Sequence, residues 1–600
     1  MGKLWVAICV LAPACATHHG DDDSSYTSIR IAPDPLTLTV PLGGTATQDY
    51  TVVGLDGSGE HDITTSCTLA VDTSFGDFNN THTFTAVPHG GTTSVVAACG
   101  MLNANAALTI DIVGSVTIGP NVPGNADQLF GAATPGSDVA RTPAIEYPID
   151  QAVAPLNLPP IEVQWTRAAN DLFHITLVSS HAKIDVYSAD PQATMDPASW
   201  SAIAGTAVGE ALTITVEGLA QAAPATKYAS TPVVLNLSHD TIDTSAIYWW
   251  ASSQGSIMSQ TFGAVGAPTQ VKGNCSGCHS LSRAGSRIGY SRCVAGSCNG
   301  EWVGFLKYDG VADTWTEVVN ADNKTIPGTY TTFAPIGKPF ATDTQSVAIV
   351  TSMTGTFGLM DPDTGTAVAS NLATVALPGR AATMPDWSAD GNQVVFASTP
   401  HPGQSVDVSD SSIAVMSYDF VAGAHTFGTP TLLVPAPITI NNQAYGNLFF
   451  PSFSPDGQLI VFNAARGAWR NFTDAKTAGQ RLVAINPNGG QPIDLAALNG
   501  GAGDRDITWP HWAPGNTSDY YWIVFSSERD YGHEVTSTNT AAACVANGVK
   551  QCKQIWIGAV SKAALMNGQL DPSSPPVWVP GQDKTADNIS PYWTVPAGLF

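Results

Sequence analysis

Apolar and polar residues alternate along short stretches of this chain, and clusters of turn-forming residues separate these stretches. Between residues 28 and 115, apolar side chains occupy every second position of 36–40 and again of 108–112, and turn clusters such as 56–59 lie between them. An alternation with a period of two places the apolar side chains on one face of a β-strand. Several such strands separated by turns predict a β-sandwich domain over 28–115.

A similar pattern over residues 116–230 predicts a second β-sandwich. A group of prolines at 155–160 marks the turn before a strand that carries Trp165, and we expect this tryptophan to anchor the core. The strands expected in this segment are 161–165, 173–178, 183–188 and 212–219.

The hydrophobic pattern of the C-terminal half repeats. Each copy begins with a short strand at a proline, passes through a glycine-containing turn, and ends in a fully apolar strand. A single small sheet of this kind cannot bury both of its faces, so the copies are expected to stack around a common axis as a β-propeller. The copies are 385–398, 451–462 and 510–527, with a truncated copy at 591–593.

These copies resemble TolB-type six-bladed β-propellers, whose repeats carry the pattern P-x-W-S-P-D-G-x-x-I-x-F. The resemblance implies six blades over residues 231–600. Degenerate copies at 282–290 and 340–349 would supply two of them, and the truncated copy at 591–593 would complete a sixth with two strands in 246–262. In that arrangement the two ends of the propeller share one sheet, which removes an open edge.

The two N-terminal segments also resemble known modules. Residues 29–33, a Gly-Gly-Thr turn and Asp62-Ile63-Thr64 resemble bacterial Ig-like domains of surface proteins. The segment 116–230 resembles fibronectin type III domains. The fold class expected for the whole chain is therefore all-β, with two β-sandwiches followed by a six-bladed propeller.

The N-terminus has the features of an export signal. A basic residue precedes the apolar run 4–12, which is too short to cross a bilayer, and small residues follow it. Cys15 lies where a bacterial lipobox has its lipidated cysteine, although the usual leucine three positions earlier is absent. We expect a signal over 1–15 with a lipid on Cys15, and a polar linker over 16–27. Ordinary cleavage nearby, giving a product without lipid, is the alternative.

Composition limits the partners. Lys+Arg number 24 and Asp+Glu 49, which gives a formal charge of -25. A surface of this sign repels phosphate backbones, so no nucleic acid is expected as a partner. The expected location is the cell envelope of a Gram-negative-type bacterium, as an outer-membrane lipoprotein or a periplasmic protein that meets the membrane through its N-terminal lipid alone.

The chemistry that can be predicted from the sequence is concentrated in Cys275-Ser276-Gly277-Cys278-His279. This C-x-x-C-H pattern is the attachment sequence of c-type haem, with Cys275 and Cys278 as thioether links and His279 as the proximal iron ligand. With Cys 10 and His 13 in the chain, chance gives roughly 0.004 occurrences, so the match is specific. The alternatives are a disulfide followed by an incidental histidine, or a zinc site completed by Cys293 and Cys298.

The remaining cysteines outside the signal fall into three pairs that are close in the chain. An exported protein meets an oxidising compartment, so disulfides are expected. Proximity in sequence predicts the pairs Cys67–Cys99, Cys293–Cys298 and Cys544–Cys552.

The repeat register places the haem motif within the propeller. Aligning 282–290 with 388–396 puts His279 where Pro385 stands and Cys278 where Met384 stands, at one mouth of the central channel. One covalent haem is therefore expected at that mouth. The first residues of other copies should pack near it, namely Met384, Phe450, Trp509 and Lys338.

Met384 is the candidate for the second iron ligand, because a thioether suits an electron-transfer haem. The alternative is that Met384 merely packs in the core. The rival side chains are Met258, Met353, His511 and His533.

Three functions remain open on the sequence. The first is an exported, lipid-anchored mono-haem cytochrome that exchanges electrons with a redox or envelope partner. The second is a peroxidase-like haem enzyme, which would need an open distal side. The third is a cell-envelope scaffold in which haem is secondary or absent, since fold alone does not give function.

Overall fold

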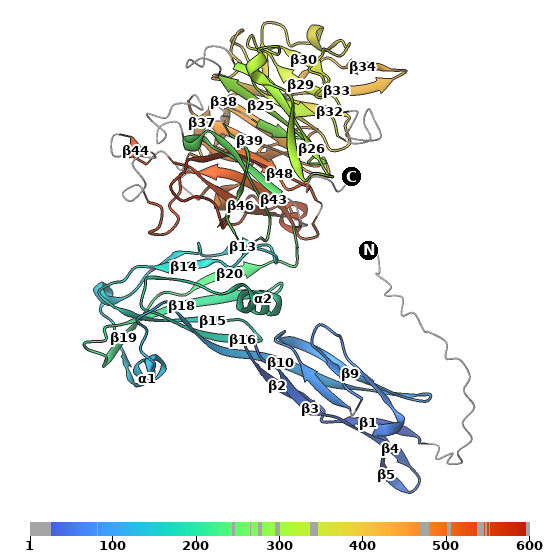
Figure 1. Ribbon diagram of the computed structural model, residues 1–600, viewed down its shortest axis with the longest axis vertical. Helices are drawn as coiled ribbons and strands as arrows, with labels where there is room; N and C mark the ends of the chain where they lie inside the picture. Colours follow the sequence, from blue (N-terminus) through green and yellow to red (C-terminus); the bar gives the residue numbers. More distant parts are fainter. Residues whose placement is uncertain are drawn as a thin grey trace. The chain divides into compact units, whose positions relative to one another are not determined.

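The computed structural model describes residues 26–595, except 81, 243–245, 265, 274–278, 294–300, 336–345, 468–478, 501–505, 516, 537–544, 547–548 and 551. The fold is all-β, and the longest helix among these residues is α2 (Pro197–Thr206) (Figure 1). In this part of the chain no helix is long and apolar enough to span a bilayer. The chain divides into two compact units, the first ending at Asp111 and the second beginning at Ile112, with residues 41–43 counted in the second.

The first unit is built from short antiparallel strands. β1 (Ser28–Ala32) pairs with β4 (Thr51–Asp56), and β9 (Gly91–Cys99) pairs with the first half of β10 (Leu102–Ile118). A disulfide joins Cys67 and Cys99, the pairing expected from the sequence. The alternate apolar residues of these strands form the core, which includes Ile31, Val40, Val52, Phe84, Val95, Leu108 and Ile110.

The second unit begins with two sheets that together contain the four strands expected in this segment, the first strand in a small sheet of three strands and the other three in a larger sheet. The core between these two sheets and α2 holds Trp165, which is fully buried against Phe173 with 5.3 Å between ring centroids. The four strands are β14 (Glu162–Trp165), β15 (Leu172–Val178), β16 (Ala182–Ser188) and β18 (Ala211–Leu219).

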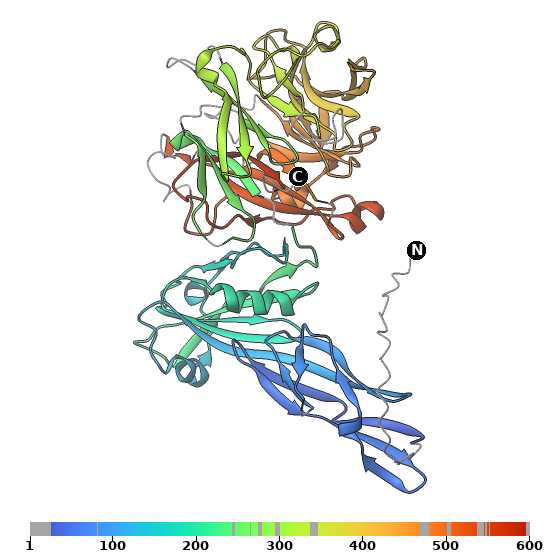
Figure 2. The same cartoon turned by 45° about the vertical axis from the view of Figure 1, so that its right-hand side comes forward.

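The rest of the second unit contains six sheets of three to five strands among the described residues, apart from two small hairpins. Each of the six has one edge strand that faces the others. In Figure 2 these sheets follow one another from green through yellow and orange to red. The edge strands are β24 (His279–Leu281), β28 (Thr331–Phe333), β31 (Ala381–Trp387), β38 (Asn447–Phe453), β42 (Thr508–Trp512) and β48 (Asn588–Thr594).

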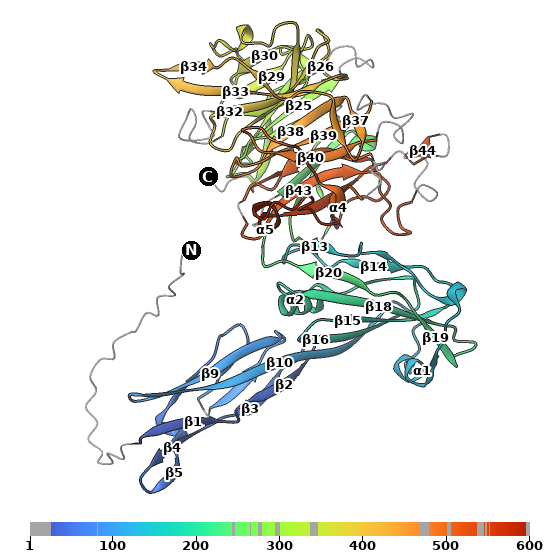
Figure 3. The same ribbon diagram turned by 180° about the vertical axis from the view of Figure 1, so that it is seen from behind.

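The six edge strands contact one another in a closed ring, in the order β24, β28, β31, β38, β42, β48 and back to β24. Sheets that meet at their inner edges in this way form a β-propeller. The ring closes through β48, from the C-terminal end of the chain, which pairs with β21 (Ala246–Ala251). The strands that follow in two of the other sheets, β39 (Ile460–Ala465) and β43 (Tyr520–Ser527), are labelled in Figure 3.

One repeat begins at a different residue from the one that the sequence pattern predicts. The copy expected at 340–349 begins earlier, because the edge strand of its sheet is β28 and its partner is β29 (Ala348–Thr351). A connection of 334–347 replaces the short turn of the other copies, and Thr331 stands where most copies have a proline. Lys338, expected at the channel mouth from the incorrect register, lies outside the described residues.

Candidate functional site

Four edge strands of the propeller share one backbone irregularity. Met384, Phe450, Trp509 and Ser590 each precede a proline, with φ of 52°, 49°, 53° and 52°. At each of these positions the strand register shifts by one residue, as in a β-bulge. A left-handed φ at a non-glycine residue costs about 1–3 kcal/mol and is typical of functional sites. The repeated bulge therefore singles out this end of the ring as the candidate site.

The sheets of β24 and β28 have no such bulge among the described residues. In the sheet of β24, His279 stands where the four bulged strands have their proline. The backbone N–H of Ser282 donates to the carbonyl of Arg287 at 3.0 Å, and that of Ser388 donates to the carbonyl of Gln393 at 2.9 Å, so the two hydrogen bonds close equivalent turns. His279 and Pro385 each lie three residues before these serines. β24 pairs with β25 (Arg287–Cys293) in unbroken register. The structure thus has His279 in the register that the sequence alignment predicts.

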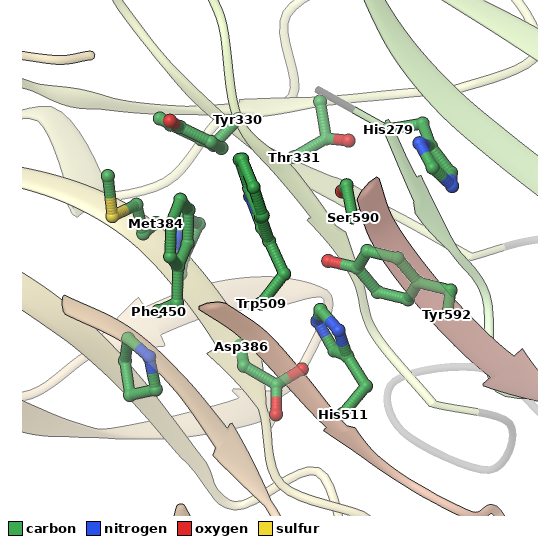
Figure 4. Close-up of a pocket in the computed structure, with 12 residues that line it drawn as sticks. His279, Tyr330, Thr331, Met384, Asp386, Phe450, Trp509, His511, Ser590 and Tyr592 are labelled. Carbon is green, nitrogen blue, oxygen red and sulfur yellow. The ribbon is translucent and has the colours of Figure 1, made fainter. Parts of the chain in front are cut away.

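The edge strands enclose a small cavity at the level of the bulges. Its volume is about 20 Å³, which is room for a single water molecule. Figure 4 shows His279 and Tyr592 on one side of it and Met384 on the other, with the rings of Phe450 and Trp509 between them. All six sheets contribute to the lining, through His279, Thr331, Met384, Phe450, Trp509, His511 and Tyr592.

His279 is buried, and its ring makes no well-formed hydrogen bond to the described residues. The residue is 3% exposed. Burial lowers the pKa of His279 to about 3, and a long hydrogen bond to the backbone of Tyr248 acts in the opposite direction by a smaller amount. The ring is therefore neutral at pH 7, which is the form of imidazole that binds a metal.

His511 and Tyr592 complete this side of the cavity. The ring of Tyr592 lies 5.5 Å from that of His279 and 3.6 Å from that of His511, measured between centroids. His511 Nδ1 lies 2.8 Å from the carbonyl oxygen of Pro591, which assigns the proton to Nδ1 and leaves a lone pair on Nε2. Burial lowers the pKa of His511 to about 3, and the nearby His279 and Arg283 act in the same direction.

Met384 packs on the opposite side of the cavity. It is 4% exposed and belongs to a hydrophobic cluster with Tyr330, Phe450 and Trp509. The Phe450 and Trp509 rings lie 5.1 Å apart, and the Tyr330 and Phe450 rings 5.8 Å apart. The structure brings Met384, Phe450 and Trp509 to one pocket with His279, as the register predicts, with Met384 surrounded by aromatic rings.

Lys553 lies beside this cluster and was not recognised in the sequence. Its ammonium nitrogen is 2.8 Å from Asp506 Oδ2, 2.9 Å from Thr508 Oγ1 and 5.1 Å from the centroid of the Trp509 ring. Both charged side chains are almost fully buried. No spacing in the sequence connects Lys553 with Trp509, because Trp509 is on β42 and Lys553 directly precedes β46 (Gln554–Ser561), two strands away in the same sheet.

Several site residues expected from the sequence lie outside the described residues, namely Cys15, Cys275, Cys278, Cys298 and Cys544. Cys293 and Cys552 are both disulfide-bonded. A disulfide sulfur does not supply the thiolate that zinc requires, which counts against the zinc alternative. The described residues contain no cluster of three or more His, Cys, Asp or Glu that could hold a metal ion.

The donor chemistry at His279 fits a haem iron, because a neutral imidazole whose nitrogens make no well-formed hydrogen bond to the described residues directly follows the Cys-x-x-Cys sequence. The cavity does not enclose a porphyrin, since 20 Å³ is far below the roughly 300–1,000 Å³ of sites for organic ligands. A haem linked to Cys275 and Cys278 would therefore have to lie outside the cavity, and the packed side chains around His279 would have to separate for ligation.

Comparisons with known proteins do not establish a family. No family model matches the chain, and no curated protein matches it. Among solved structures, the chain is similar to a puromycin-hydrolysing peptidase of Mycobacterium tuberculosis, with 14% identity and a TM-score of 0.27 over 46% of this chain and 36% of that one. This chain thus spans about a third of the length of the peptidase.

Two further similar structures are an oligogalacturonate lyase from Vibrio parahaemolyticus and the β-propeller domain of a trilobed protease from Pyrococcus furiosus. The lyase has 10% identity and a TM-score of 0.29 over 59% of this chain and 87% of its own. The protease domain has 7% identity and a TM-score of 0.26 over 58% and 79%. Scores this low carry no conclusion about activity.

Proposed function

We propose that this chain is an exported mono-haem c-type cytochrome that exchanges electrons with a redox partner in the cell envelope. The observation that carries the proposal is His279, a buried neutral imidazole whose ring nitrogens make no well-formed hydrogen bond to the described residues, placed directly after Cys275 and Cys278 in the sequence. An unsatisfied buried imidazole is costly for folding, and ligation of a metal ion would satisfy one of its nitrogens.

When bound, the haem supplies reversible one-electron chemistry. The chain would hold it through two thioether links, at Cys275 and Cys278, and through His279 as an iron ligand. Met384 is the proposed second ligand, and His511 is its rival because its Nδ1 already pairs with a backbone carbonyl, as metal-binding histidines usually do. The aromatic cluster around Met384 would keep water away from this side.

The wider setting belongs to the same proposal. A TolB-type six-bladed propeller would carry the haem, and an Ig-like domain and a fibronectin-like domain would space it from a membrane anchor on Cys15. The ring of six sheets and the strand β48 that closes it support the propeller part.

A visible spectrum of the full chain, produced in a bacterium with c-type haem maturation, tests the proposal. We expect a sharp reduced α-band that survives acid–acetone extraction and disappears in the Cys275→Ser, Cys278→Ser double variant. His279→Ala should change the spectrum from low-spin to high-spin iron. His425→Ala is the matched control, because His425 is also buried in the propeller but bonds to Tyr418 Oη at 2.9 Å.

A scaffold protein without haem is the second candidate, and the small volume of the cavity favours it. Absence of any haem band from the wild-type protein, with Cys275 and Cys278 joined to each other, would support the scaffold and contradict the cytochrome.

A further inference from the structure

We propose that a second cavity, where the second β-sandwich meets the propeller, binds a zwitterionic ligand, namely a short peptide with a free amino group and a free carboxylate. Both sides of this junction belong to the second compact unit. One hydrophobic core, which includes Trp165 of the sandwich and Trp556 of the propeller, continues across it. The described residues that line the second cavity differ from those that line the cavity at His279, so the proposed site does not depend on haem.

The second cavity is large enough for an organic ligand. Its volume is about 550 Å³. Sites for organic ligands measure roughly 300–1,000 Å³ and occur preferentially where two domains meet. Apolar side chains form part of the wall, through Ile149 from the sandwich and Ala497, Pro575 and Pro576 from the propeller. These side chains suit the aliphatic part of a ligand and leave its charged ends to the polar residues of the wall.

Arg529 brings a positive charge to the wall of this cavity. The residue is 3% exposed, its Nε donates to Ser527 Oγ at 3.3 Å, and its Nη2 donates to the carbonyl oxygen of Leu498 at 2.7 Å. The guanidinium also lies over the ring of Trp556, 5.2 Å from its centroid. These contacts fix the plane of the guanidinium, and a fixed planar guanidinium can bind a carboxylate through two parallel N–H donors.

Among the described residues, two carboxylates also line the cavity. Glu146 comes from β12 (Ile145–Tyr147) in the sandwich, and Asp530 directly follows Arg529 in the propeller. Both residues are exposed, and His533 Nδ1 lies 2.8 Å from Glu146 Oε2. The carboxylates would repel a ligand that carries only negative charge, and the guanidinium would repel one that carries only positive charge. A ligand with one acidic and one basic end is complementary to both.

The wall beside Arg529 is held in place without a ligand. Gly532 has a φ of 50° and lies so close to the sandwich that a Cβ atom here would come within 2.1 Å of Gln164 Oε1. Tyr531 stacks on Trp578 with 4.1 Å between ring centroids. Because these contacts fix the turn, little conformational entropy is lost when a ligand binds beside it.

Isothermal titration calorimetry of the full chain with trialanine tests the proposed site. The matched probes are trialanine with an amidated carboxyl end and trialanine with an acetylated amino end. We expect trialanine to bind with a Kd of about 1 mM or tighter. Amidation should weaken binding by about tenfold or more, because the buried Arg529 loses its partner. Acetylation should weaken it by about two- to fivefold, since the exposed carboxylates contribute less.

Two variants assign the two ends of the peptide. Arg529→Gln should abolish the difference between trialanine and its amide, and the Glu146→Gln, Asp530→Asn double variant should abolish the difference between trialanine and its acetylated form. Arg380→Gln is the matched control, because Arg380 Nε also donates to a serine, Ser398 Oγ at 3.0 Å, and Arg380 is not among the described residues that line the cavity. This variant should bind trialanine as the wild type does.

The comparison of the three peptides on wild-type protein needs no variant, so it decides the question even if Arg529→Gln does not fold. Failure of the wild type to bind trialanine, or equal binding of trialanine and its amide, would overturn the proposed site. An equal loss of binding in Arg380→Gln would show a general effect and also contradict it. Protein made without haem should give the same affinities, so a negative result here leaves the proposed cytochrome untouched.

Discussion

The Asp386 carboxylate accepts a hydrogen bond of 2.7 Å from the backbone N–H of Phe453 and so joins two neighbouring edge strands of the propeller beside the cavity. Burial raises the pKa of Asp386, and Arg283, 3.9 Å away, acts against this rise. The bond connects β31 with β38 at a point where no strand pairing exists between the two sheets.

We expect Asp386→Ala to lower the free energy of unfolding by about 1–3 kcal/mol, because the N–H of Phe453 would lose its acceptor in a buried place. Asp386→Asn keeps an oxygen acceptor and should cost less than about 1 kcal/mol. Chemical denaturation of both variants measures the difference. Equal losses for Ala and Asn would show that the hydrogen bond does not join the sheets.

Ser590 tests the strain in the repeated bulge. Its φ of 52° favours glycine, and its small buried side chain contributes little packing area. Ser590→Gly should leave the free energy of unfolding unchanged or raise it by up to about 1 kcal/mol. Ser590→Val, with a branched side chain at the same φ, should lower it. A clear loss of stability in the glycine variant would mean that the bulge carries no strain.

Asp240, which follows β20 (Val233–Leu237), is hydrogen-bonded to the backbone at the start of β43 in the propeller. Its carboxylate is almost fully buried and accepts hydrogen bonds from the backbone N–H groups of Ser518, Asp519 and Tyr520, at 2.8, 3.1 and 2.9 Å, and from the Trp522 indole at 3.3 Å. Asp240→Ala removes all of these acceptors at once, so we expect a loss of roughly 3 kcal/mol in calorimetric unfolding. Asp571→Ala, at a carboxylate that accepts a hydrogen bond from the backbone N–H of Ala497, is the milder comparison.

The two cavity histidines predict sensitivity to acid in protein made without haem. Their folded pKa is about 3, whereas the unfolded value is about 6.5. Between these values the unfolded state binds more protons, so the free energy of unfolding falls as the pH falls. From pH 7 to pH 5 the loss should be about 2 kcal/mol for each histidine.

The His279→Gln, His511→Gln double variant should show a flatter pH dependence over that window, measured by denaturation at several pH values. His61→Gln, at a well-exposed histidine, serves as the control. An unchanged slope in the double variant would show that these two imidazoles are not buried in the neutral form.

Much of the propeller could be predicted from the sequence because its repeat is local. A proline, a turn and an apolar strand lie within about a dozen residues, and this was enough to place His279 in register with Pro385. The same locality explains the error at β28, where Thr331 replaces the proline and a long connection separates the paired strands.

The contact between Tyr592 and His279 could not be predicted in this way. Tyr592 reaches His279 through closure of the ring, and Lys553 reaches Trp509 across a sheet, so neither contact follows from spacing along the chain. The bulges were also not foreseen, although each lies at a residue that precedes a proline in the repeat, and that dipeptide is the signal that could have indicated them.

We propose that haem is attached covalently at Cys275 and Cys278. Mass spectrometry of the proteolytic peptide that spans 275–279, taken from protein matured in a c-type host, tests it most directly. We predict that the peptide carries one haem and loses it in the Cys275→Ser, Cys278→Ser variant. A wild-type peptide found without haem, with its two cysteines free or joined as a disulfide, would contradict the claim.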